Sequence, residues 1–155
     1  MTPAINLVKK KKIQHQVHEY DHDPSNESYG LEAAEKTGVQ KERVFKTLVA
    51  TLESGELIVG VVPVSSMLNM KLIAKAMKAK KAAMADKIAV ERSTGYVLGG
   101  VSPLGQKKQL RTVIDSSATN FPTIYVSAGR RGLEIELNPE DLKNLTRGCF
   151  AAICQ

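Results

Sequence analysis

Residues 94–105, Thr-Gly-Tyr-Val-Leu-Gly-Gly-Val-Ser-Pro-Leu-Gly, hold four of the chain's eleven glycines within twelve positions. Glycine permits positive φ angles and a close approach by another molecule, whereas Pro103 fixes its own φ and disfavours helix at the preceding residue. The apolar residues Val97, Leu98 and Val101 between the glycines predict a short strand that runs into a tight loop. Two interpretations stay open here: a buried turn between strands, or a loop whose backbone amides bind a ligand.

Length and composition predict one soluble domain that spans residues 1–155. The chain is 43% hydrophobic and 25% charged, as is ordinary for a globular protein. Its apolar runs are shorter than the roughly 20 residues of a membrane span, and its lysine-rich start does not resemble a signal peptide. Two cysteines suit a reducing compartment, so we expect a cytoplasmic protein. The formal net charge of +6 favours an anionic partner.

Short strands and scattered helices follow one another without a regular alternation, which predicts a mixed α+β fold with about seven strands. A Thr2 cap before Pro3 and an Asn138 cap before Pro139 are typical helix starts. The expected helices cover residues 3–12, 31–37, 69–80, 87–93 and 139–145. The expected strands, besides the one at 97–101, cover residues 14–20, 44–52, 57–63, 111–114, 123–127, 133–137 and 149–153.

Lys46 is unusual because of its position on the predicted strand 44–52. Residues of one parity share a face of a strand, so Lys46 lies on the same face as Val44, Leu48, Ala50 and Leu52. A buried lysine is paired or functional, because an unpaired buried charge is costly. The alternative is an exposed strand end, from which the Lys46 ammonium reaches water.

The densest basic cluster lies on the predicted helix 69–80. Lys71, Lys75 and Lys78 share one face of that helix, with Lys80 and Lys81 beside them. Such lysines either form a solvated helix face or contact the phosphates of a nucleic acid. The pattern leaves both open.

Several standard catalytic motifs are missing from the sequence. It has no Walker phosphate loop, no Gly-x-Gly-x-x-Gly at a helix start and no Gly-x-Ser-x-Gly nucleophile motif. His15, His18 and His22 have no further ligand residues at metal-binding spacing, and the cysteines Cys149 and Cys154 lack a zinc partner. We therefore expect neither a metal nor a cofactor.

Three ordered blocks resemble the YbaK/prolyl-tRNA-synthetase-associated editing domain family. They are Val-Phe-Lys-Thr-Leu-Val at 44–49, the glycine-rich stretch at 93–105 with the family's Gly-x-x-P loop at 100–103, and Ile-Tyr-Val-Ser-Ala-Gly at 124–129 continuing through 131–137. The resemblance covers nearly the whole chain and is strongest to the free-standing bacterial branch. It implies a single domain with a barrel-like mixed sheet flanked by helices.

The resemblance also implies an activity, namely removal of cysteine from mischarged Cys-tRNA(Pro) in cooperation with prolyl-tRNA synthetase. The expected partners are therefore charged tRNA and the synthetase, not DNA or a membrane. In this family the substrate thiol attacks its own ester and no protein nucleophile is used, which suits the missing motifs and predicts that neither cysteine of the chain is catalytic. A related branch of the family removes alanine from tRNA instead, so this substrate is one alternative. The other alternative is a protein that is not an enzyme, namely a module that binds tRNA or the synthetase without catalysis.

Carried over by position, the resemblance assigns roles to individual residues. Lys46 is the essential catalytic-site lysine at the tRNA end, either as a phosphate anchor or as a base. Apart from the resemblance, the basic helix face itself leads us to expect that Lys71, Lys75 and Lys78 bind tRNA. The expected substrate-binding residues are Tyr20, Thr47, Gly99, Gly100, Ser102, Pro103, Ser127, Gly129 and Glu134.

Overall fold

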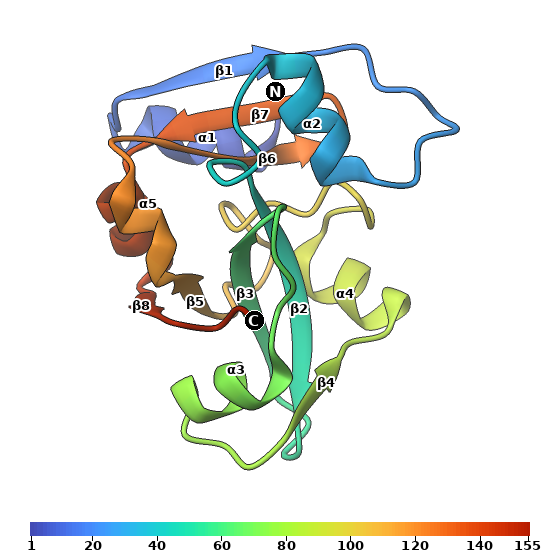
Figure 1. The fold of residues 1–155 in the computed structure, drawn as a ribbon, viewed down its shortest axis with the longest axis vertical. Helices are drawn as coiled ribbons and strands as arrows, with labels where there is room; N and C mark the ends of the chain where they lie inside the picture. Colours follow the sequence, from blue (N-terminus) through green and yellow to red (C-terminus); the bar gives the residue numbers. More distant parts are fainter.

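A long antiparallel hairpin forms the centre of the computed structural model, which describes residues 1–155 (Figure 1). Its strands are near-continuously apolar because side chains pack against both faces. A short strand pairs with the far end of the hairpin, and two parallel strands extend its other edge. The resulting five-stranded sheet has the order β4 (Ala82–Met84), β2 (Phe45–Leu52), β3 (Leu57–Pro63), β5 (Arg111–Asp115), β8 (Cys149–Ala151).

A second, three-stranded antiparallel sheet lies across the upper end of the hairpin (Figure 1). Its order is β1 (His15–Glu19), β7 (Leu133–Leu137), β6 (Ile124–Arg130). The two sheets meet at one parallel bridge between Val44 and Tyr125, where the Tyr125 amide donates to the Arg43 carbonyl at 3.1 Å. Strand pairing does not continue beyond this bridge, so the barrel-like closure expected for the sheet is not confirmed.

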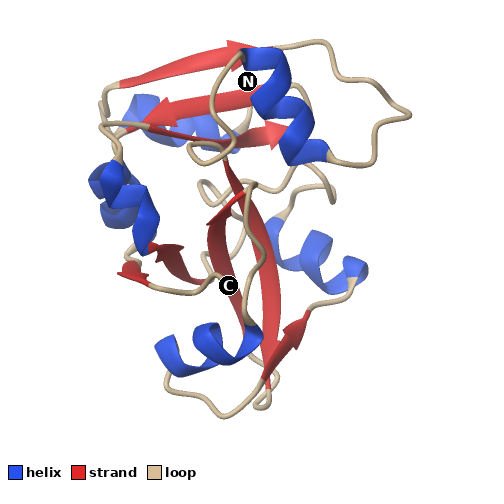
Figure 2. Cartoon of the chain, in the orientation of Figure 1, coloured by secondary structure: helices blue, strands red, loops and turns tan.

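Five α-helices and one 3-10 helix pack around the sheets (Figure 2). The predicted caps are confirmed, because the Thr2 hydroxyl accepts from the Ile5 amide at 3.2 Å and Asn138 accepts from the Glu140 amide at 2.8 Å. None of the helices combines the length and the apolar character that a bilayer crossing requires. The helices are α1 (Pro3–Lys10), α2 (Tyr29–Thr37), α3 (Met70–Ala76), α4 (Lys87–Thr94), η1 (Ser116–Asn120) and α5 (Pro139–Thr146).

Strand β2 separates two hydrophobic cores. Phe45 and Val49 belong to a core of 21 buried residues that α1 and the small sheet share with the hairpin. Ala50 and Leu52 belong to a core of 8 buried residues beneath α3, and Leu48 packs against it. The alternation predicted for this strand is therefore confirmed, and Lys46 lies on the side of the smaller core.

The strand expected at residues 97–101 is wrong. Gly99 has a φ of +93°, and the Gly100 amide donates to the Val97 carbonyl at 2.9 Å, which makes this segment a turn. The side chains of Val97 and Leu98 are 70% and 50% exposed instead of packed in a sheet. Apolar residues between glycines therefore gave a false strand signal.

The end of α3, the end of β8 and one unpredicted strand also differ from expectation. Helix α3 ends at Ala76 instead of residue 80, because Lys78 turns into the left-handed region at φ +57°. The chain then forms the unpredicted strand β4, whose start is held by Glu53, which accepts from the Lys80 amide at 2.7 Å. Strand β8 ends at residue 151 instead of 153, and Cys149 at its start is exposed.

Candidate active site

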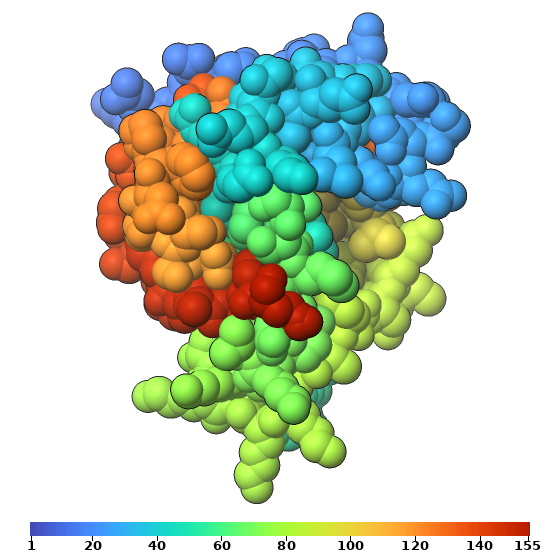
Figure 3. Space-filling model, viewed as in Figure 1, coloured from blue at the N-terminus to red at the C-terminus, as the bar shows by residue number.

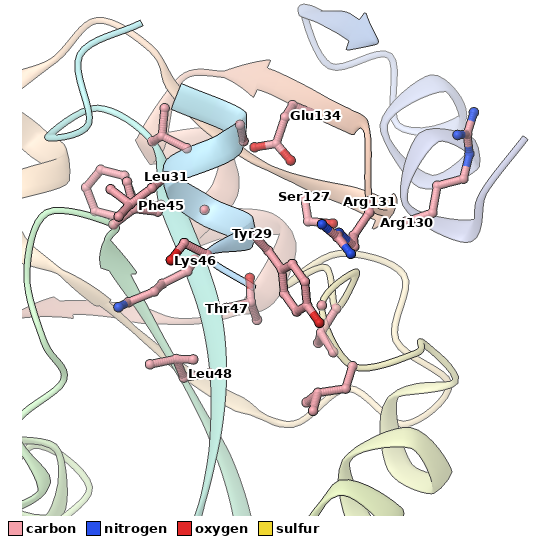
Figure 4. Close-up of a pocket in the computed structure, with 18 of the residues that line it drawn as sticks. Tyr29, Leu31, Phe45, Lys46, Thr47, Leu48, Ser127, Arg130, Arg131 and Glu134 are labelled. Carbon is pink, nitrogen blue, oxygen red and sulfur yellow. The ribbon is translucent and has the colours of Figure 1, made fainter. Parts of the chain in front are cut away.

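A cavity of about 380 Å³ opens where β2 and β6 diverge beyond their single bridge (Figure 4). Thr47 lines it from β2 and Ser127 from β6, while the start of α2 and the turn at Gly99 close its sides. Six of the predicted site residues meet here: Tyr20, Lys46, Thr47, Gly99, Ser127 and Glu134. The remaining lining residues are Glu27, Ser28, Tyr29, Gly30, Leu31, Ala33, Val44, Phe45, Leu48, Val64, Leu98, Val101, Arg130 and Arg131.

Thr47 presents polar groups to this cavity that have no partner in the protein. Its hydroxyl oxygen is buried and makes no hydrogen bond. Its backbone amide and carbonyl also point away from β3. In this hairpin the even-numbered residues exchange hydrogen bonds with β3, as shown by the Val64 amide, which donates to the Val44 carbonyl. Thr47 is odd-numbered, so its amide and carbonyl lie on the other edge of the strand. On the opposite edge β4 covers only residues 50–52 of β2. Buried unpaired polar groups at a cavity wall indicate that a ligand satisfies them.

Glu134 is a buried acid at the same wall. It is 6% exposed, its carboxylate makes no hydrogen bond or ion pair with the protein, and burial raises its pKa to about 8. Burial also raises the pKa of the nearby Tyr20 phenol, and the charge of Glu134 raises it further. The floor of the cavity is therefore a desolvated acid and phenol.

Arg131 fastens the segment before α2 over the cavity. Its Nη2 donates to Glu32 at 3.2 Å and to the carbonyls of Asp23 at 3.0 Å and Asn26 at 2.8 Å, while its guanidinium lies 3.9 Å from the Tyr29 ring centroid. Although burial raises the pKa of Glu32, hydrogen bonds from the Asp23 amide, Lys36 and Arg131 bring it below its usual value. The charge of Arg131 is thus balanced by Glu32. Its Nε is buried without a partner.

Lys46 reaches the cavity from the other face of β2. It is partly buried, and none of the chain's ion pairs involves it. Figure 4 shows its ammonium pointing away from Ser127 and Glu134, which lie on the opposite side of the strand. The structure therefore places Lys46 at an edge of the cavity with its charge free for an anionic ligand.

The glycine-rich stretch supports the wall more than it lines it. A Cβ on Gly99 would lie 2.7 Å from the Tyr29 ring, and one on Gly100 would lie 2.7 Å from the Arg130 Cα, so the stretch packs directly on α2 and on the β6–β7 turn. The Gly100 amide is already bonded within its own turn, but no backbone carbonyl takes the amide of Gly99. Four predicted substrate-binding residues lie outside the lining: Gly100, Ser102, Pro103 and Gly129.

Two of those four are tied into the loops themselves. The buried Ser102 hydroxyl accepts from the Leu104 amide at 3.1 Å, and the Gly129 amide donates to the Ser127 hydroxyl at 3.2 Å. Ser102 thus shapes the loop behind the wall. Gly129 holds the Ser127 side chain, which does line the cavity.

The basic cluster is remote from this cavity. Lys71, Lys75 and Lys78 are exposed, but α3 lies at the lower end of the molecule, whereas the cavity lies beside α2 at the upper end (Figure 1). The chain around α3 and β4 projects from that lower end (Figure 3). Lys78 lies beyond the helix end, so the three lysines do not share one helical face.

Neither cysteine lines the cavity. Cys149 is exposed on β8. Burial, together with the nearby Asp115 carboxylate, raises the pKa of Cys154 to about 12, although the charge of Lys46 opposes this. A thiol with so high a pKa is a poor nucleophile, because the thiolate is the reactive form.

Sequence reasoning missed the α2 side of the site. Tyr29, Leu31 and Ser28 lie in a segment that was expected to be a loop and the start of an unremarkable helix. Arg130 and Arg131 also line the cavity, and the sequence patterns assign no role to them. The available signal was an aromatic residue next to Gly30, an arrangement too common to point to a site.

The family described as "Aminoacyl-tRNA editing domain" matches residues 26–145, and the chain belongs to that family. The resemblance of the three sequence blocks is thereby confirmed.

The sequence is similar to two curated bacterial proteins. "Putative Cys-tRNA(Pro)/Cys-tRNA(Cys) deacylase EbsC" of Enterococcus faecalis (strain ATCC 700802 / V583) is 40% identical over 153 residues, which cover 98% of this chain and 92% of that protein. "Uncharacterized protein YwhH" of Bacillus subtilis (strain 168) is 30% identical over 115 residues, or 74% of this chain and 73% of that protein.

Solved structures share the fold. The structure of "a putative trans-editing enzyme for prolyl tRNA synthetase" matches with a TM-score of 0.83 at 21% identity and covers all of this chain and 99% of its own. That of "hypothetical protein APE2540" matches with a TM-score of 0.88 at 22% identity and covers 99% of both chains. At these identities the likeness concerns the fold alone.

Proposed function

We propose that this chain is a trans-acting editing deacylase that removes cysteine from mischarged Cys-tRNA(Pro). Membership of the editing-domain family and the similarity to the Enterococcus protein support this activity. The observation that carries the chemistry is the composition of the cavity wall. It holds no histidine or cysteine, and its Ser127 and Thr47 hydroxyls are bonded to no base.

A wall without an activated nucleophile suits a reaction in which the substrate supplies its own. The cysteine sulfur attacks the ester carbonyl carbon, the bond from that carbon to the ribose oxygen breaks, and the thiol proton ends on the released ribose hydroxyl. The amino acid leaves as a thiolactone. Because the thiol and the ester belong to one molecule, the contribution of the cavity is to hold the conformer in which the sulfur faces the carbonyl carbon.

The backbone supplies donors for the negative charge that develops on the ester oxygen. The Thr47 amide faces the cavity edge of β2, and the Gly99 amide lies at the cavity without a carbonyl partner. Preorganised amides of this kind stabilise an oxyanion because they need no reorganisation during the reaction. This assignment replaces Gly100, whose amide is occupied.

The positive group at the edge suits the nucleic-acid end of the substrate. Lys46 lines this edge and has no acidic partner. An unpaired lysine binds phosphate as a point charge, so the proposed role of Lys46 is to anchor the acceptor end. We expect prolyl-tRNA synthetase to be the partner in the cytoplasm, where mischarged tRNA arises.

The basic cluster of Lys71, Lys75 and Lys78 is proposed to bind a more distant part of the tRNA. Replacing the three residues with Ala should weaken tRNA binding and flatten its salt dependence, because each lost phosphate contact removes about one unit from the salt slope. An unchanged slope would assign the affinity to the cavity edge or to the synthetase.

The deciding experiment compares tRNA(Pro) charged with cysteine, alanine or serine as substrates of the purified protein. We expect rapid release of cysteine and much slower release of serine, because a hydroxyl supplies far less nucleophile than a thiol with a pKa near 8.5. Preferred release of alanine would assign the chain to the alanine-specific branch. Binding of all three without turnover would show a non-catalytic module.

A further inference from the structure

Glu134 is the one acid of the cavity wall that is both buried and without a cation. The other acid of the wall, Glu27, is exposed. The buried Glu32, which does not line the cavity, forms ion pairs with Arg131 and Lys36, each with a nitrogen–oxygen distance of 3.2 Å. Glu134 has none, although a desolvated carboxylate is costly to maintain alone.

None of the cations that line the cavity forms an ion pair with Glu134. Arg131 is held by Glu32 and by two backbone carbonyls on the α2 side. Lys46 points away from it on the far side of β2 (Figure 4). Burial alone sets the raised pKa of Glu134, with no neighbouring positive charge to lower it. In the free protein burial therefore favours the protonated acid, and Glu134 becomes part of an ion pair only when a ligand brings a cation.

We infer that Glu134 binds the α-ammonium group of the aminoacyl ester, so that the cavity accepts only esters whose amino acid has a free α-amine. This inference rests on the proposed function and names the substrate class of the same site. It predicts that N-acylated aminoacyl-tRNAs are refused.

The distribution of charge along the cavity supports this orientation. Lys46 carries a positive charge at one edge of the cavity, whereas the buried wall on the other side of β2 carries Glu134 (Figure 4). An aminoacylated tRNA end is charged in the complementary sense, with phosphates at the nucleotide end and an ammonium at the amino-acid end. The Tyr20 phenol beside Glu134 provides a second polar group for the amine.

Formation of this pair requires no net proton exchange with solvent. A protonated Glu134 and an unprotonated amine together hold the same single proton as a carboxylate and an ammonium. Transfer of that proton within the cavity creates the ion pair when the ester binds. A site built around such a hydrogen bond rejects analogues that lack the group, because its buried polar atom is then left unpaired.

The test uses three esters of tRNA(Pro): cysteinyl, N-acetylcysteinyl and 3-mercaptopropionyl, the last being cysteine without its α-amine. All three keep the thiol and the ester. We expect the wild-type protein to cleave both altered esters at least about 100-fold more slowly, in line with the discrimination of hydrogen-bonding sites. Glu134→Gln should slow cysteinyl-tRNA cleavage by a similar factor and leave 3-mercaptopropionyl-tRNA cleavage nearly unchanged.

The variant Glu27→Gln is the matched control, because it alters the exposed acid of the same cavity. It should keep the wild-type ratio between cysteinyl and 3-mercaptopropionyl esters. Far-ultraviolet circular dichroism establishes that both variants are folded.

Two results would overturn the inference. Equal cleavage of cysteinyl and N-acetylcysteinyl tRNA by the wild type would show that the α-amine is not bound. An equal loss for both thiol esters in Glu134→Gln would show that Glu134 acts on the thiol or the ester instead.

A binding comparison separates this inference from the proposed function. The protein's affinity for adenosine that carries cysteine through a stable 3′-amide is compared with its affinity for the same compound without the α-amine. If no ester is cleaved, the proposed function fails. The inference is still supported if the wild type binds the amine-free compound more weakly than the cysteine compound, while Glu134→Gln binds the two equally. Equal binding of the two compounds to wild type contradicts it.

Discussion

Replacing Glu134 with Gln should change how the stability of the free protein depends on pH. Burial raises the pKa of this carboxyl from 4.5 to about 8. Between these two values the folded state holds a proton that the unfolded chain has released. The free energy of unfolding therefore falls as pH rises, by about 1.4 kcal/mol per pH unit from this group.

The interval from the unfolded pKa to pH 7 is about 2.5 units, so Glu134 lowers stability by roughly 3 kcal/mol at pH 7 relative to its protonated state. That is a large share of the roughly 5–15 kcal/mol by which domains are stable. Gln has nearly the same shape and cannot ionise. The variant should thus gain stability over the wild type progressively between pH 5 and pH 8.

Urea denaturation at pH 5, 6, 7 and 8 measures this difference. Glu27→Gln, which alters an exposed acid of the same cavity, should follow the wild-type curve. Other groups titrate in this range too, so the result lies in the difference between Glu134→Gln and wild type. A difference that stays constant with pH would show that Glu134 is ionised in the folded protein and would refute the reasoning.

Three further predictions concern catalysis and packing. Lys46→Ala should abolish deacylation with the fold intact. Lys46→Arg should keep weak activity, because a guanidinium also binds phosphate but cannot act as a base. An inactive Lys46→Arg variant that binds charged tRNA normally would favour the role of Lys46 as a base. Gly100→Ala places a Cβ 2.7 Å from the Arg130 backbone, so it should cost about 1–3 kcal/mol of stability and slow deacylation. Thermal unfolding and turnover measure these two effects, and an unchanged melting temperature would contradict this packing. The double variant Cys149→Ser, Cys154→Ser should remain active in the deacylation assay, and a folded but inactive protein would overturn the substrate-assisted mechanism.

Local patterns in the sequence were sufficient for most of the fold. The caps at Thr2 and Asn138, the positions of the two hairpin strands and the alternation of β2 all follow from interactions between residues close in the chain. Such signals reflect backbone propensity and periodicity, which operate over a few residues. They failed at residues 97–101, where glycine turns and tertiary packing override the apolar pattern, and at β4, which forms only because an edge of β2 is available for pairing.

The candidate site divides in the same way. The sequence by itself determined the family, through its three blocks. It drew attention to Lys46 through its place on an apolar strand face, and the family resemblance added Thr47 and Glu134. Only the tertiary structure decided that β2 and β6 part after one bridge, which creates the cavity. It also decided that Glu134 is buried without a cation while Lys46 points the other way. Burial and charge pairing depend on groups from distant segments, so the chemistry of an acid or a lysine cannot be read from its neighbours in the chain.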